Sequence, residues 1–319
     1  MFRPLIPPLC ELVRSVRKAF RPGRRRAQFA ASRREVRHWR FMTQWKPGAR
    51  TAVMALVLSA TAVVFPRLSR TQPVPPPERT EPAGPVKETL HYTVEWRLVT
   101  AGKARLSLTP HPEPPSGSEP EAESEVKWRA GLHLESVGLV SKLFKVNNDY
   151  YALLNRELCA LNSHLMTNEG SKKRETTVDF RREDHKAFYL ERDLVKNVEA
   201  STHEIDVPDC VHEVVGGLYL LRNMDLEPGQ SVEIPVSDGK KSVSAKVEVE
   251  RREKVKTPSG VYDTTRYEIF LFNNVLYRRS GRLFVWLSND PSRLPVQIRV
   301  RLQFHIGTIT LQLEKIERT

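Results

Sequence analysis

VQIRVRLQFHI, residues 296–306, is the stretch of the chain in which apolar and polar side chains alternate most regularly. Its apolar positions are Val296, Ile298, Val300, Leu302, Phe304 and Ile306. Successive side chains of a strand point to opposite faces, so this alternation predicts a strand with one face against a core and one face in water. Half-buried strands of this kind are typical of antiparallel sheets, and we therefore expect an antiparallel sheet.

The pattern extends to both sides of this stretch. After Gly307 the apolar positions change phase, to Ile309, Leu311 and Leu313. We interpret Gly307 as a bulge or bend that curves the strand. Residues 90–99 and 244–250 alternate in the same way, and turn-forming Gly and Pro residues flank them. The sheet is therefore expected to contain several curved strands.

One segment departs from the strand pattern. DCVHEVVGGLYLLRNM, residues 209–224, has apolar residues at helical spacing, and Asp209 is placed to cap a helix. Residues 109–125, rich in Pro, Ser, Gly and Glu, predict a flexible loop between strands. We expect residues 88–317 to form one mainly β domain, with a single antiparallel, strongly curved or barrel-like sheet and one short helix, rather than a two-sheet sandwich.

The excess of positive charge lies at the N-terminus. Residues 1–50 hold 14 Lys and Arg against two acidic residues, whereas the rest of the chain has 37 basic and 36 acidic residues. We interpret residues 1–50 as a basic arm, disordered or cytoplasmic, of which residues 1–41 are alternatively a stretch upstream of a true start at Met42. A cytoplasmic nucleic-acid binder acting through this arm is the third functional alternative, and we expect no nucleic-acid partner.

An apolar run and a Pro-rich stretch follow the arm. Residues 51–66 are uncharged and predict the apolar region of a signal peptide, cut after Ala62, with an uncleaved membrane anchor as the close alternative. The basic flank places the body on the outer side of the membrane, in the periplasm or anchored to the inner membrane. Residues 67–87 predict an extended linker.

Two cysteines lie in the body of the chain, Cys159 and Cys210. Outside the cytoplasm they can form one disulfide. The alternative, which we favour at this point, is a pair of buried thiols without a bond.

Four stretches together resemble a known family. The opening strand pair of this family is similar to LHYTVEWRLVTAGKARLSL (90–108), and its helix, with the Leu-x-Pro-Gly and Thr-Pro-x-Gly turns, is similar to residues 216–268. Its Trp-containing strand is similar to GRLFVWLSNDPSRLPVQIRV (281–300), and its last strand is similar to FHIGTITLQL (304–313). The family is the bacterial domain of unknown function 3108. The resemblance implies an exported, β-rich envelope protein and implies no reaction.

Candidate chemistry is sparse. The most metal-like cluster is His203, Cys210 and His212, but its spacing is not that of a zinc site, and we predict neither metal nor cofactor. An envelope hydrolase or transferase, using Asp206, Asp209, His212 and Asp290, is the second functional alternative. No catalytic residue is predicted, because no base is placed beside a nucleophile.

The first functional hypothesis is a non-catalytic envelope protein with a binding or scaffolding role. A curved sheet with one apolar face can enclose a lipid or another apolar ligand, with the helix as a lid. The same alternation also fits a packed core without a ligand, which we favour. Expected partners are the membrane, through an uncleaved N-terminal segment, an apolar ligand and other envelope proteins.

Overall fold

The computed structural model describes residues 87–318 except 98, 112–124 and 304–306. The basic arm, Met42, the apolar run with its cleavage position, and nearly all of the linker and of the 109–125 loop lie outside the described residues. No helix among the residues that are described is both long and apolar enough to cross a membrane.

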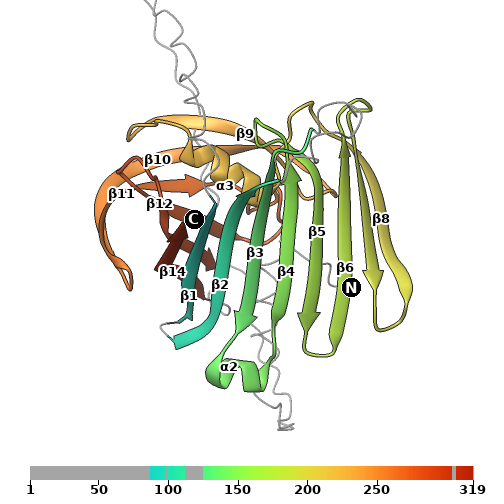
Figure 1. Cartoon of the computed structure of the whole chain (residues 1–319), viewed down its shortest axis with the longest axis horizontal. Helices are drawn as coiled ribbons and strands as arrows, with labels where there is room; N and C mark the ends of the chain where they lie inside the picture. Colours follow the sequence, from blue (N-terminus) through green and yellow to red (C-terminus); the bar gives the residue numbers. More distant parts are fainter. Residues whose placement is uncertain (1–86, 98, 112–124, 304–306, 319) are drawn as a thin grey trace, which may run out of the picture. The chain divides into compact units, whose positions relative to one another are not determined.

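Fourteen strands form one antiparallel sheet in the described part of the chain (Figure 1). The first eight follow one another along the sheet, with a short helix between the third and fourth. They are β1 (Glu88–Trp96), β2 (Val99–Pro110), β3 (Trp128–Ser136), α2 (Gly138–Leu143), β4 (Asn147–Leu154), β5 (Ala160–Glu169), β6 (Lys172–Arg181), β7 (Lys186–Asp193) and β8 (Val198–Asp206).

A second helix leads into the remaining six strands. They are α3 (Val214–Arg222), β9 (Ser231–Ser237), β10 (Ser242–Thr257), β11 (Gly260–Ile269), β12 (Gly281–Ser288), β13 (Pro295–Leu302) and β14 (Thr308–Arg318). The last strand returns to pair with the first, so the sheet order runs from β8 back to β1, across to β14 and on to β9. Strands β8 and β9 are the two edges, and the sheet is not closed.

The predicted fold class, a mainly β chain with an antiparallel and strongly curved sheet, is confirmed. Residues 244–250 fall within β10, where Ala245, Val247 and Val249 are buried as their alternation predicted. One expectation about the helices is wrong, because α2 is a second helix. It has six residues, too few to show a helical period in the sequence, and it starts at Gly138, whose φ of 58° turns the chain out of β3.

Gly307 has a different role from the predicted one. Strand β13 ends at Leu302, and Gly307, with φ 88°, belongs to the turn into β14, where its carbonyl accepts a hydrogen bond from the Leu302 amide at 3.1 Å. The two strands then pair antiparallel, with Arg301 opposite Thr308. The change of phase in the sequence therefore marks a chain reversal, because each arm of a hairpin carries its own alternation.

The core lies on the concave face of the curved sheet. Alternate residues of nearly every strand point there, and α3 packs onto the same face (Figure 1). The turn between β9 and β10 also reaches the first half of the sheet: Lys240 Nζ lies 3.4 Å from Glu191 Oε2 on β7. A Cβ added at Gly239 would lie 2.7 Å from Val178 on β6. These contacts bring the two halves of the open sheet together around one interior.

Candidate functional site

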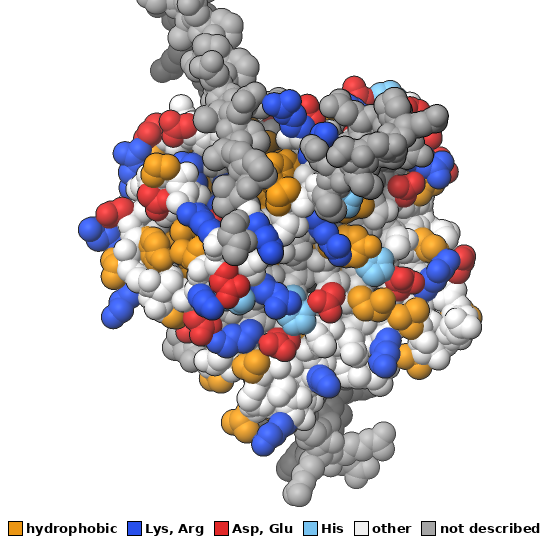
Figure 2. Space-filling model, viewed as in Figure 1, with side chains coloured by type: hydrophobic (Ala, Val, Ile, Leu, Met, Phe, Trp, Pro, Cys, Tyr) orange, Lys and Arg blue, Asp and Glu red, His pale blue; other side chains and the backbone are white. Residues whose placement is uncertain are grey.

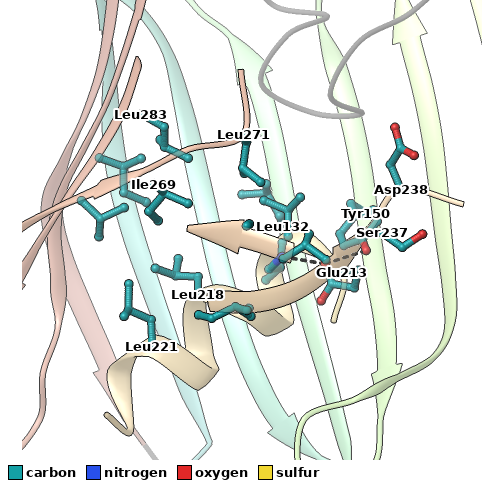
Figure 3. A pocket seen from close by; sticks show the side chains of 18 of the residues that line it. Leu132, Tyr150, Glu213, Leu218, Leu221, Ser237, Asp238, Ile269, Leu271 and Leu283 are labelled. Carbon is teal, nitrogen blue, oxygen red and sulfur yellow. Dashed lines mark hydrogen bonds between the residues drawn. The ribbon is translucent and has the colours of Figure 1, made fainter. Parts of the chain in front are cut away.

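A cavity of about 120 Å³ lies between α3 and the concave face of the sheet. Every strand except β7 and β8 contributes to its wall, together with α3. Most of the wall is aliphatic: Leu132, Leu218, Leu221, Ile269, Leu271 and Leu283 surround the space in Figure 3. The cavity therefore belongs to the interior of the barrel-like unit and not to its outer surface.

Helix α3 is held in place at its N-terminus by Glu213. This side chain accepts hydrogen bonds from the amides of Val215, at 2.6 Å, and of Gly216. A Cβ at Gly216 would lie 2.9 Å from Glu213 Oε1, so a larger residue there would push the capping carboxylate aside. The bonds satisfy amides that the first turn of a helix leaves without partners.

The prediction that Asp209 caps α3 is wrong. Its carboxylate lies 2.6 Å from His185 Nδ1 instead. The chain between Asp209 and the helix pairs with β9, where the His212 amide donates to Pro235 O at 2.9 Å and the Ser237 amide to His212 O at 2.9 Å. This pairing sets the start of the helix at Val214, five residues after Asp209, and leaves Glu213 as the capping residue.

One end of the cavity is polar. Tyr150 Oη donates a hydrogen bond of 2.8 Å to Glu213 Oε2, and Ser237 and Asp238 lie on the same side of the cavity, opposite Leu218, Leu221 and Leu283 (Figure 3). Burial raises the pKa of Glu213 to about 6, although the hydrogen bonds from Tyr150 and the two helix amides lower it. Burial also raises the pKa of Asp238. The site is thus a mainly apolar space with two poorly solvated carboxyl groups at one end.

Cys159 and Cys210 form a disulfide, with their Cα atoms 5.1 Å apart, where the sequence favoured two unbonded thiols. The bond joins the residue before β5 to the segment before α3. Backbone pairing holds these segments together, because the Ala160 amide donates to Val211 O at 2.8 Å. His212 lies beside them, with its Nδ1 2.7 Å from Leu158 O. The disulfide therefore ties the start of α3 to the sheet.

The three weak metal candidates do not form a ligand set. Cys210 is in the disulfide, and the buried His212 faces Leu158 O and the Cys210 sulfur. His203 lies on β8, with its Nε2 2.9 Å from Ser201 Oγ. Within the residues that the structure places, no three His, Cys, Asp or Glu side chains lie close enough together to hold a metal ion.

The candidates for the hydrolase or transferase alternative are also dispersed. Asp206 ends the edge strand β8 and lies 2.7 Å from Lys186 Nζ, and Asp209 pairs with His185. Asp290 lies in the turn between β12 and β13, in the other half of the sheet, and accepts the Ser292 amide at 2.8 Å. Each of these carboxylates contacts a different local partner, and together they do not form a catalytic arrangement.

The sequence did not indicate the polar residues of the cavity. Tyr150 and Glu213 are 63 residues apart, and no local pattern predicts that they meet. The one available signal was the position of Glu213, directly before the apolar residues of the helix, which is where a capping side chain stands.

A family model described as protein of unknown function (DUF3108) matches residues 91–314. No curated protein matches the chain. Among solved structures, a β-barrel-like protein of the domain of unknown function DUF1849 from Brucella abortus is similar, with 8% sequence identity, a TM-score of 0.45, and coverage of 73% of this chain and 98% of that one.

Two further structures are similar at a lower TM-score. An inferred exported protein with a YmcC-like fold from Bacteroides fragilis has 13% identity and a TM-score of 0.25, covering 76% of this chain and 97% of that one. An inferred lipoprotein from Parabacteroides distasonis has 11% identity and a TM-score of 0.27, covering 75% of this chain and 96% of that one.

Proposed function

The chain belongs to the DUF3108 family of proteins of unknown function, and from that premise we propose that it is an exported cell-envelope protein that binds an apolar group of an amphiphilic ligand without catalysis. The observation that carries this proposal is the two-sided lining of the cavity under α3. Leucine and isoleucine side chains surround the space, and the Tyr150–Glu213 pair closes one end of it.

The volume limits the ligand. An engineered apolar cavity of about 150 Å³ stays dry and binds benzene, whereas pockets for drug-sized ligands measure roughly 300–1,000 Å³. A cavity of about 120 Å³ accordingly suits a ring or a short stretch of alkyl chain. With α3 in its present position, a whole phospholipid would not fit inside.

The polar end limits the chemistry of the ligand's head. Glu213 and Asp238 offer carboxyl groups that accept hydrogen bonds, and in their ionised form they repel an anion. A hydroxyl, amide or ammonium head would donate to them, whereas a fatty-acid carboxylate would be disfavoured. We therefore expect an amphiphile whose head is neutral or cationic.

Two features support export. The apolar run at residues 51–66 follows a basic flank, which is the arrangement of a signal peptide or an N-terminal anchor. The Cys159–Cys210 disulfide needs an oxidising compartment to form and persist. The proposed location is the periplasm, with the body either free or anchored to the inner membrane.

A neutral fluorescent probe tests the cavity directly. N-phenyl-1-naphthylamine should bind the full chain through its phenyl ring, with a rise in emission, and Leu218→Trp, which fills the cavity, should reduce its affinity at least tenfold. Val261→Trp is the matched control, because Val261 is 64% exposed and is not part of the cavity wall.

Competition with the same probe tests the head group. At pH 7.5, hexanol and hexylamine should displace the probe at lower concentrations than hexanoate does. Equal probe binding by Leu218→Trp and the wild type would rule out the cavity as the binding site, and preferential displacement by hexanoate would contradict the proposed head group.

A further inference from the structure

One end of the first half of the sheet forms a continuous edge. Strands β1 to β8 are consecutive antiparallel neighbours, so the β1–β2, β3–β4, β5–β6 and β7–β8 connections all lie at the same end. Backbone hydrogen bonds link them in turn, from Val137 N to Ala101 O, Gly170 N to Lys145 O and Leu194 N to Lys173 O, at 3.0, 2.8 and 2.9 Å. We call the described residues of these connections, 97, 99, 137–146, 170–173 and 194–198, the rim.

The rim carries nearly all of the exposed large apolar side chains of the described chain. Seven such side chains are exposed, and only Val261 lies elsewhere. The other six are Val99, Leu139, Leu143, Leu194, Val195 and Val198, and Leu139 is the most exposed at 75%. Because a soluble protein scatters single apolar side chains over its surface, their concentration at one end indicates a contact surface.

The charge of the rim is of one sign. Its residues include Arg97, Lys142, Lys145, Lys172, Lys173 and Lys196, all exposed, and no Asp or Glu. One acidic residue, Asp193, borders the rim and accepts hydrogen bonds from the amides of Val195 and Lys196. Figure 2 shows hydrophobic and basic side chains next to each other at the end where α2 lies. The connections at the opposite end are mixed in sign: residues 182–185, for example, read REDH. The positive rim is therefore a local feature in a body that is otherwise electrically balanced.

We propose that the rim docks onto an anionic lipid surface. Leucine and valine side chains would enter the boundary between head groups and acyl chains, and the lysines would lie among anionic head groups. The composition favours lipid over a protein partner, because protein–protein interfaces are depleted in lysine and enriched in aromatic residues, whereas five of the six basic residues here are lysines. This docking is independent of any ligand in the cavity.

A fluorophore placed on the rim tests the proposal in the full chain. Leu139→Cys, in a Cys10→Ser background, is labelled with a nitrobenzoxadiazole probe and the protein is reconstituted into vesicles. Vesicles with 30% phosphatidylglycerol should raise the emission at least twofold with a blue shift, and pure phosphatidylcholine should not. The same label at Val261→Cys should not respond to either lipid, even if residues 51–66 anchor the chain.

Reversing the charge of two lysines gives a second test. Lys142→Glu together with Lys196→Glu should remove at least half of the rise in emission at position 139, and 0.5 M NaCl should weaken that rise in the chain that keeps both lysines. If anionic vesicles do not change the emission of the label at position 139, the proposal is overturned, and a protein becomes the partner to test for this surface. An equal response at position 261, or an equal response to both lipids, would overturn it as well.

Discussion

Glu213 both caps α3 and lies in the wall of the cavity. A carboxylate is an unusual choice for a buried cap, since burial penalises its charge. Here the charge has hydrogen bonds from two helix amides and from Tyr150, and the residue is only 3% exposed. The sequence could suggest a cap before this helix, but it could not choose Glu213 over Asp209, because that choice depends on pairing with β9.

The raised pKa of Glu213 predicts a pH dependence of stability. Between its usual pKa of 4.5 and the folded value of about 6, the folded protein holds a proton that the unfolded chain releases. This contribution is present below pH 4.5 and is lost as the pH rises through 6, by roughly 2 kcal/mol for a shift of about 1.5 units. Urea unfolding should therefore show that the stability of the wild type relative to Glu213→Gln falls by that amount from pH 4 to pH 7.

Comparison with Glu213→Gln cancels the titration of the other groups, and the glutamine keeps an oxygen that can cap the helix. If the free energies of unfolding of the wild type and this variant change in parallel across pH 4–7, the claim that folding raises the pKa of Glu213 is contradicted.

Helix α3 is fixed at both ends rather than hinged. Glu213 and the disulfide hold its start. At its other end Arg222 lies 2.7 Å from Glu88 on β1, and it donates to the carbonyls of Ser292 and Arg293, at 3.0 Å each. These contacts describe a plug that closes the interior, and they argue against a helix that swings open as a lid.

The Glu88–Arg222 pair yields a prediction for this element. Burial raises the pKa of Glu88, but Arg222 and Arg318 outweigh it and hold the pKa below its usual value. Glu88→Gln would leave Arg222, whose side chain is 11% exposed, without its counter-charge, and should lower the free energy of unfolding by about 3 kcal/mol.

The matched control is Glu317→Gln on β14. Its carboxylate pairs with His91 and Lys315 at the surface, so its loss should leave the free energy of unfolding nearly unchanged. Equal effects of the two substitutions in urea unfolding would show that Arg222 does not depend on Glu88.

The elements differ in how far the sequence determines them. The alternation of Ala245, Val247 and Val249 predicted their burial, because every second side chain of a half-buried strand points to the same face of the sheet. Helix α2 escaped prediction because six residues span less than two turns. Gly307 was assigned a bend within a strand because the alternation alone does not distinguish a bulge from a hairpin.

At the scale of the whole molecule, the curved antiparallel sheet could be predicted but its interior could not. The pairing of β1 with β14 joins residues more than 200 positions apart, and no local pattern encodes it. The cavity depends on such long-range contacts: α3, β4 and the turn after β9 bring Leu218, Tyr150 and Asp238 to its wall. The alternation that predicts a core does not show whether the core is filled.

Native mass spectrometry of the protein purified from its own cell envelope tests the central claim, that the cavity under α3 holds a ligand. The wild type should retain a small noncovalent amphiphile with a neutral or cationic head, and Leu218→Trp, purified in the same way, should not. A wild type without any adduct, or the same adduct on both proteins, would contradict the account.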